Sequence, residues 1–220
     1  MYSWGENSDG QLGIGNSVQQ ALPNQLPPIH HKIVQIDCGG EFSAALTIEG
    51  DVYCWGSFLI FGNEGRQSPT LVSVSNIRQI SCGFQHILAL TKEGGLYAWG
   101  GNRDGQLGLG GYIGYAFTPT EIPFFISKGV SQIACGSFHS LALLKDGSVY
   151  SWGYNKYLQL GVGSTDRVEF WPMEIEGIEG EVMEMRCGAY HSMVINSCYD
   201  LYCWGQNEYG QQGNGSTKEE

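Results

Sequence analysis

The stretch "CGSFHSLALLKDGSVYSWGYNKYLQLGVG" at residues 135–163 decides the fold, because related versions of it return along the chain. It contains two runs rich in apolar and aromatic residues, separated by the turn signal Asp146-Gly147. An Asp-Gly pair between such runs is typical of a β-hairpin. A cluster of glycines follows, and glycine supplies the positive φ angles that tight turns need. The stretch therefore predicts antiparallel strands joined by tight turns.

Two short phrases define an internal repeat. An aromatic-x-Trp-Gly phrase contains Trp4, Trp55, Trp99, Trp152 and Trp204, and a Cys-Gly phrase contains Cys38, Cys82, Cys135 and Cys187. Each of these cysteines precedes the next repeat tryptophan by 17 residues, whereas the Trp-to-Trp distances are 51, 44, 53 and 52 residues. A fixed distance within a variable period indicates a rigid hairpin joined by loops of different length, as in repeat architectures. The single domain 1–220 divides into approximate units 4–54, 55–98, 99–151 and 152–203, with a remainder 204–220.

Each unit is expected to contain three or four antiparallel strands. The hairpin turns are "EGD" at 49, "EGG" at 93 and "DGS" at 146, but the fourth copy is "NSCYD", with Tyr199 in place of glycine. We expect that hairpin to change its turn type. A fourth short strand is expected after the proline in "PNQLP", "PTLVS", "PTEIP" and "PMEIE". In the glycine phrases, such as "NRDGQLGLG", Asn and Gln are expected to satisfy loop backbone groups, and the copy after Trp55 is broken. Such a unit of about 50 residues matches one blade of a β-propeller.

These phrases resemble the repeat of the regulator of chromosome condensation family, and the resemblance extends from Tyr2 to about Gly215. It implies an all-β propeller whose blades are built from such units. Family propellers are rings of seven blades, which would take roughly 350 to 400 residues at this period. Because the chain has four full units and half-units at both ends, we expect an incomplete propeller. Two other interpretations are a smaller closed ring of four or five blades and a chain that closes by self-association, since open edge strands favour pairing.

Charge and composition exclude several classes of partner. The net charge is −11 and only 11 basic residues are spread over 220, so we expect no direct binding to nucleic acid, which requires Lys and Arg against phosphates. No apolar run approaches the roughly 20 residues of a spanning helix, so no membrane insertion is expected. Seven cysteines without a visible secretory signal predict reduced thiols in the cytoplasm or nucleus.

The repeated Cys and His residues invite a metal or catalytic interpretation. Three Cys–His pairs are four residues apart, and their histidines are His86, His139 and His191. Zinc needs about four such ligands converging, whereas a repeat distributes one pair to each blade. A histidine and the serine that follows it on a strand point to opposite faces, so they form no catalytic dyad. We therefore expect structural residues, with the tryptophans packed between blades, and predict no metal, no cofactor and no catalytic residue.

Residues outside the repeat are the candidates for contacting a partner. The segment "EFWPMEIEGIEGEVMEM" at 169–185 is acidic and contains no Lys or Arg, which is typical either of a solvated loop or of an acidic rim that attracts a basic partner. The apolar loops 58–67 and 110–117 are expected to supply contact anchors. The candidates are Glu174, Glu176, Glu179, Glu181, Trp171, Phe58, Tyr112 and Tyr115.

The sequence therefore predicts a non-catalytic protein-interaction propeller that serves as an adaptor or scaffold. The family resemblance implies a second hypothesis, a guanine-nucleotide exchange factor for a Ran-type small GTPase. In that hypothesis the four acidic candidates would compete for the phosphate-binding lysine or the Mg²⁺ of the GTPase.

Overall fold

The computed structural model describes residues 1–57, 60–62 and 65–218, and its regular structure is almost entirely β-strand. Within these residues the strands form five antiparallel sheets. Three four-stranded sheets are the first, second and third blades, a three-stranded sheet is the fourth blade, and a two-stranded sheet lies at the N-terminal end. The all-β fold expected from the repeat is confirmed.

The strands follow one another in simple up-and-down order within each sheet. The N-terminal sheet contains β1 (Tyr2–Gly5) and β2 (Gln20–Gln25). The first blade contains β3 (Ile33–Cys38), β4 (Phe42–Thr47), β5 (Val52–Gly56) and β6 (Arg66–Leu71). The second contains β7 (Ile77–Cys82), β8 (His86–Thr91), β9 (Leu96–Gly101) and β10 (Tyr115–Glu121). The third contains β11 (Val130–Cys135), β12 (His139–Leu144), β13 (Val149–Tyr154) and β14 (Val168–Glu174). The fourth contains β15 (Val182–Cys187), β16 (His191–Asn196) and β17 (Leu201–Gly205).

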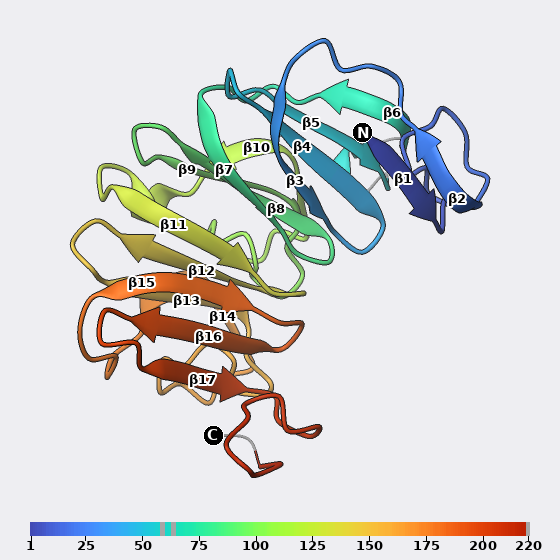
Figure 1. Ribbon diagram of the computed structural model, residues 1–220. Helices are drawn as coiled ribbons and strands as arrows, with labels where there is room; N and C mark the ends of the chain where they lie inside the picture. Colours follow the sequence, from blue (N-terminus) through green and yellow to red (C-terminus); the bar gives the residue numbers. More distant parts are fainter. Residues whose placement is uncertain (58–59, 63–64, 219–220) are drawn as a thin grey trace.

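The blades form an open arc, whose two ends lie apart (Figure 1). The first strands of successive blades lie next to one another, because β3 contacts β7, β7 contacts β11 and β11 contacts β15. No hydrogen bonds pair β1 or β2 with β17 among the described strands. The expectation of an incomplete propeller is confirmed, and the alternative of a smaller closed ring is wrong.

Glutamine side chains join the first strands of neighbouring blades. Gln35 donates through Nε2 to the carbonyl of Ile80 at 2.7 Å and accepts the Ile80 N–H at 3.0 Å. Gln79 and Gln132 make the donor half of this contact to the next blade, at 3.1 and 2.7 Å. A carboxamide can bond a peptide group in both directions. The glutamine side chains therefore link neighbouring blades in place of the backbone hydrogen bonds that join strands within one sheet.

The core lies between the blades. All six residues of β8 and of β12 are buried, since each strand is covered by a blade on both sides. In β16 buried and partly exposed residues alternate instead. This alternation is the pattern of a strand with one covered face. The repeat places an apolar run in the second strand of each blade. How fully that run is buried therefore depends on whether another blade covers it on both sides.

The hairpin turns keep one hydrogen-bond pattern in every blade. Gly50 has a φ of 102° and donates its N–H to Thr47 at 3.1 Å. Tyr199 has a φ of 66° and donates in the same way to Asn196 at 3.0 Å. The expected change of turn type at Tyr199 is therefore wrong, and a tyrosine occupies a left-handed position that favours glycine.

The fourth strands begin before the proline rather than after it. In β14, Glu169 pairs with Gly153 and Met173 pairs with Ser151, and Pro172 lies in the interruption between these two pairs. Proline has no N–H to donate, so it is tolerated where the ladder is broken. The proline therefore marks the middle of the strand and not its start.

The glycine loops are held by a buried asparagine. Asn155 accepts the N–H of Leu160 at 3.2 Å and donates to the carbonyls of Ser164 and Asp166 at 3.0 and 2.9 Å. Asn7 and Asn207 make the equivalent bonds. The expected role of loop asparagines is confirmed.

Each blade presents its loops on two opposite faces. We call the face formed by the first-to-second and third-to-fourth strand connections the loop face, and the face formed by the hairpin turns and the interblade linkers the linker face. Within the described residues, no helix combines the length and apolar character needed to cross a bilayer.

Candidate protein-interaction surface

The repeated histidines join one blade to the next. His86 and His139 are fully buried, and their Nε2 atoms lie 2.9 and 3.0 Å from the hydroxyl oxygens of Ser140 and Ser192 on the following blade. Burial lowers the pKa of each of these histidines to about 3. Both rings are therefore neutral near neutral pH, and His139 bonds Ser192 of the next blade and not Ser140, which follows it in the sequence.

Each of these serines belongs to a larger network between blades. Ser140 donates to the carbonyl of Gln106 at 2.8 Å, and the indole N–H of Trp152 donates to the same oxygen at 2.9 Å. The carbonyls of Gln11 and Gln159 accept from a serine and a tryptophan in the same way. Because the hydroxyl proton points to the glutamine carbonyl, Ser140 accepts its bond from the histidine Nε2–H. The sequence placed the histidine and tryptophan in the repeat, but it did not show that serine and glutamine complete the contact.

The junction between the first and second blades replaces this network with apolar side chains. Phe42 stands where the other blades have histidine, and Ile87 stands where they have serine, and both lie in one core cluster with Ile60 from the broken loop. The buried indole N–H of Trp99 has no hydrogen-bond partner in the described part of the chain. The loss of His, Ser and the loop Gln carbonyl at one junction indicates that these groups act as a unit.

The four repeated cysteines line one hollow of about 310 Å³ at the inner edge of the arc. Each blade supplies one of these cysteines, and the contacts between the first strands of successive blades bring all four to this hollow. The histidines do not line this hollow. Burial raises the pKa of the Cys82 and Cys135 thiols and raises that of Cys187 to about 12. The described residues contain no group of three or more His, Cys, Asp or Glu that could hold a metal ion.

The predicted aromatic contact residues lie around the fourth strands of the second and third blades. The rings of Tyr115 and Phe117 stack at 5.7 Å. Tyr112 meets Phe170 edge-on at 6.1 Å, and its side chain is strongly exposed. Trp171 is half exposed, and a Cβ on the glycine at 110 would overlap its ring. Phe58 lies outside the described residues.

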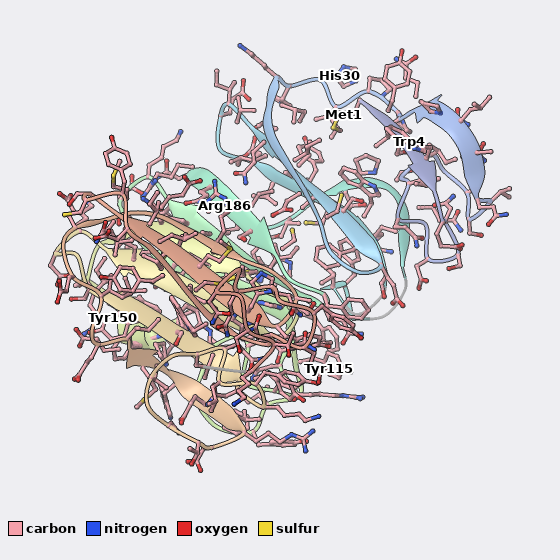
Figure 2. All side chains as sticks on the ribbon, turned by 60° about the horizontal axis from the view of Figure 1, so that its bottom comes forward. Met1, Trp4, His30, Tyr115, Tyr150 and Arg186 are labelled. Carbon is pink, nitrogen blue, oxygen red and sulfur yellow. The ribbon has the colours of Figure 1, made fainter. Side chains whose placement is uncertain are left out.

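The acidic candidates lie on the linker face. Glu174 ends β14 and accepts a hydrogen bond from the hydroxyl of Tyr150 at 3.1 Å. The other three, Glu176, Glu179 and Glu181, lie in the linker to β15. Figure 2 shows Tyr115 and Tyr150 on opposite sides of the blades. The structure therefore does not bring the acidic and aromatic candidates together.

A second aromatic group, which the sequence did not predict, lies on the loop face. We call the side chains of Phe84, Phe138, Tyr154, Tyr157 and Tyr190 the aromatic surface. Phe138 contacts Phe84 at 5.5 Å and stacks on Tyr190 at 6.1 Å, while Tyr157 meets Tyr190 at 5.4 Å. These rings come from three successive blades, and all of them are exposed or partly exposed. The signal in the sequence was an aromatic residue between each Cys-Gly and its His in three of the four copies.

Charged side chains surround the aromatic surface. The Lys156 ammonium lies 5.0 Å from the Tyr157 ring centre, and the Arg167 guanidinium lies 5.7 Å from that of Tyr154. Partial burial raises the pKa of Asp104, and the neighbouring arginine charges oppose this change. Burial also raises the pKa of Tyr190, as do Tyr154 and Tyr157 beside it. The surface thus combines tyrosine, phenylalanine and arginine, residue types that are enriched in protein interfaces.

Comparisons with known proteins agree with this architecture. A family model described as RCC1-like domain matches residues 1–220. The E3 ubiquitin-protein ligase HERC2 of Homo sapiens is 37% identical over 233 residues, which cover 99% of this chain and 5% of HERC2. The crystal structure of human WBSCR16 matches with a TM-score of 0.88 at 26% identity and covers 100% of this chain and 60% of that chain. Prp20p from Saccharomyces cerevisiae, whose structure was described with its binding properties to Gsp1p and histones, matches with a TM-score of 0.87 at 24% identity, over 99% of this chain and 57% of that chain.

The chain spans less than two thirds of each of these proteins. The family model nevertheless matches the chain from end to end, and the relatives share its propeller fold. This chain therefore belongs to the RCC1-like domain family.

Proposed function

We propose that this chain is a non-catalytic protein-interaction propeller, an adaptor or scaffold, and that its partner docks on the aromatic surface. The observation that carries the proposal is the contact of five exposed or partly exposed rings from three blades on the loop face. Tyrosine and arginine are enriched among the residues that dominate binding energy, and clusters of them lie near interface centres. Aromatic rings that are already packed also lose little conformational freedom on binding.

The backbone beneath the aromatic surface is held in place. The N–H of Gly40 donates to Phe84 at 2.9 Å, that of Phe84 donates to Ser137 at 2.9 Å, and that of Ser137 donates to Ala189 at 3.0 Å. These bonds link the corresponding turns of all four blades. A surface that is already rigid loses less conformational freedom on association, which supports a docking role for these turns.

The relatives support a protein partner without identifying it. HERC2 is named as a ubiquitin-protein ligase, and the Prp20p structure was described with binding to Gsp1p and histones. Nucleotide exchange on a small GTPase is the alternative function. In that alternative the partner would contact the acidic linker, because Glu176, Glu179 and Glu181 are exposed.

The test compares two surface variants of the full chain by crosslinking and mass spectrometry in cell extract. Phe138→Ser combined with Tyr190→Ser removes the centre of the aromatic surface, and Glu176→Gln is the control on the linker face. We expect the aromatic variant to lose specific crosslinked partners and the control to retain them, with both variants showing the near-ultraviolet circular dichroism of the parent chain. Equal recovery of the same partners by the aromatic variant would refute the docking site.

The alternative is tested with the same preparations. Release of fluorescent GDP is measured from a panel of purified small GTPases, including a Ran type. The adaptor proposal expects no acceleration at catalytic amounts of the chain. Acceleration that is lost when Glu174, Glu176, Glu179 and Glu181 are all changed to Gln would instead establish exchange activity.

A further inference from the structure

A hollow of about 680 Å³ opens on the linker face of the second blade. Its walls include Val74 from the linker before the blade and Ile126 from the linker after it. Tyr97 of β9 and Glu121 of β10 line it from within the blade, and Glu93 lines it from the hairpin turn. Tyr97 and Glu121 pair across the two strands. The hollow therefore combines an aromatic ring, two carboxylates and apolar walls.

The third blade shows what occupies the equivalent position. Tyr150 and Glu174 pair there as Tyr97 and Glu121 do in the second blade, and Asp146 takes the place of Glu93 in the turn. The Lys128 ammonium of the preceding linker lies 5.8 Å from the Tyr150 ring centre. Hydrogen bonds from Ser148 lower the pKa of Asp146, and the Lys128 charge lowers it further. The chain thus places one of its own cations between a tyrosine ring and an acidic turn.

The aromatic environment of that lysine is also supplied by its linker. Lys128 Nζ lies 4.3 Å from the ring centre of Phe124, which in turn lies 5.0 Å from the Tyr150 ring. A cation held over aromatic rings is attracted by their negative faces. The third blade therefore covers its tyrosine with groups of the chain itself, and a smaller hollow of about 400 Å³ stays open beside Asp146 and Glu174.

The second blade has no internal cation in this position. Its preceding linker is residues 72–76, whereas the linker that carries Lys128 is residues 122–129. The carbonyls of Asn76 and of the glycine at 129 each accept the N–H of the lysine in the next hairpin turn, so these two residues are equivalent. The residues before them, Ser75 and Lys128, are therefore counterparts. The shorter linker supplies neither a lysine nor a phenylalanine, which leaves the hollow open.

The two carboxylates that line the hollow of the second blade have unused hydrogen-bond acceptor positions. Glu121 takes part in no hydrogen bond or ion pair with the described residues, whereas its counterpart Glu174 is bonded to Tyr150. Glu93 accepts a hydrogen bond from Asn76 at 2.6 Å, and this bond is the largest cause that lowers its pKa, with smaller ones from its own backbone N–H, Thr91 and the Lys92 charge. The adjacent Lys92 extends its ammonium to the carbonyl of Glu49 on the previous blade, at 3.2 Å. A carboxylate has about four acceptor positions, so both glutamates retain capacity for an incoming donor.

We propose that the hollow receives a lysine or arginine side chain from a partner protein, with its charged end between Glu93 and Glu121 and its alkyl stem against Tyr97. Lysine and arginine bury their stems along apolar surface while the charged head stays at a polar edge. Charge-assisted bonds to carboxylates then fix the head. The site lies on the linker face and does not depend on docking at the aromatic surface.

The test is a titration of the ¹⁵N-labelled full chain, followed by its amide chemical shifts. The probes are Nα-acetyl-lysine methylamide and Nα-acetyl-arginine methylamide, and the uncharged control is Nα-acetyl-norleucine methylamide. We expect the two cationic probes to shift the amides of Gly94 and Gly95 at millimolar concentration, and the norleucine probe to leave them unchanged. The corresponding Gly147 of the third blade should respond more weakly, because the Lys128 charge already acts on Asp146 and no tyrosine lines the hollow there.

Two matched variants separate this site from general attraction to an acidic protein. Glu93→Gln with Glu121→Gln should weaken the cationic probes by at least about tenfold, since the loss of a single charge-assisted bond already costs about that factor. Asp146→Asn with Glu174→Gln makes the same charge change in the third blade and should leave binding at Gly94 unchanged. Equal shifts with norleucine, equal shifts at Gly147, or full binding by the Glu93/Glu121 variant would each overturn the proposal. Partner loss in the aromatic-surface experiment is a separate result and bears only on the proposed function.

Discussion

Replacing His139 with phenylalanine should make the chain less stable near neutral pH and more stable in mild acid. Burial, with a smaller contribution from the charges of His86 and His191, lowers the pKa of His139 to about 3 in the folded chain. An unfolded histidine has a pKa of about 6.5. Between these values the unfolded chain binds more protons than the folded chain, so acid lowers the free energy of unfolding. The stabilisation is complete above the unfolded pKa and is lost as the pH falls towards the folded one.

The size of the effect follows from these two pKa values. One such histidine loses about 2 kcal/mol of stability between pH 7 and pH 5. At pH 7 the variant loses the bond to Ser192, whose hydroxyl still donates to Gln159, so the cost should be about 1 kcal/mol. The ring itself fits, because Phe42 already occupies this position over its glycine in the first blade. The variant should therefore be about 1 kcal/mol less stable than the parent chain at pH 7 and about 1 kcal/mol more stable at pH 5.

The measurement is urea unfolding at both pH values, followed by tryptophan fluorescence. Equal dependence of the unfolding free energy on urea in both chains would show that the same surface is exposed on unfolding. A variant that is destabilised by the same amount at pH 7 and pH 5 would refute the reasoning, because it would mean that His139 takes up its proton in the folded chain.

Three further predictions test the geometry of the repeat. Tyr199→Gly should raise the free energy of unfolding by about 0.5–1 kcal/mol, because it relieves a left-handed backbone at φ 66°, and a decrease in thermal unfolding experiments would contradict this. Gly108→Ala should cost more stability than Gly163→Ala by roughly 1–3 kcal/mol, since both have a similar positive φ but only the first places a methyl 2.8 Å from the Trp152 indole nitrogen. Equal costs in urea unfolding would show that backbone strain alone matters. Trp99→Phe should cost about 1 kcal/mol less than Trp152→Phe, because the Trp99 N–H has no partner to lose, and the reverse order would disprove the assigned difference between the two junctions.

Much of the blade was predictable from local signals. The Asp-Gly turns, the apolar second strands and the glycine phrases predicted the hairpins and loops, because each of these signals acts within about ten residues of the chain. The fourth strand was predicted to start after its proline, whereas pairing in β14 begins at Val168, ahead of Pro172. The reason is that this strand pairs with an existing neighbour, so register with β13 overrides the local preference of proline.

The candidate surface was harder to predict. The sequence singled out Trp171 and Tyr112 because they lie outside the repeat, but it passed over Phe138 and Tyr190 because they lie inside it. Residues more than 50 positions apart meet only when blades stack, as Phe84 and Phe138 do. The two candidate groups also separated onto opposite faces, which depends on the direction of each strand in the folded blade.

By itself, the sequence determined that the chain is a series of repeated β-units of one family, since hairpins, turns and apolar strands are encoded in short stretches. Only the tertiary structure decided what the repeated polar residues do. His86 bonds Ser140 of the following blade, four repeated cysteines line one hollow, and one linker places a lysine beside a tyrosine ring where another does not. These outcomes depend on the spacing between blades, and that spacing is set by the packing of side chains from different units.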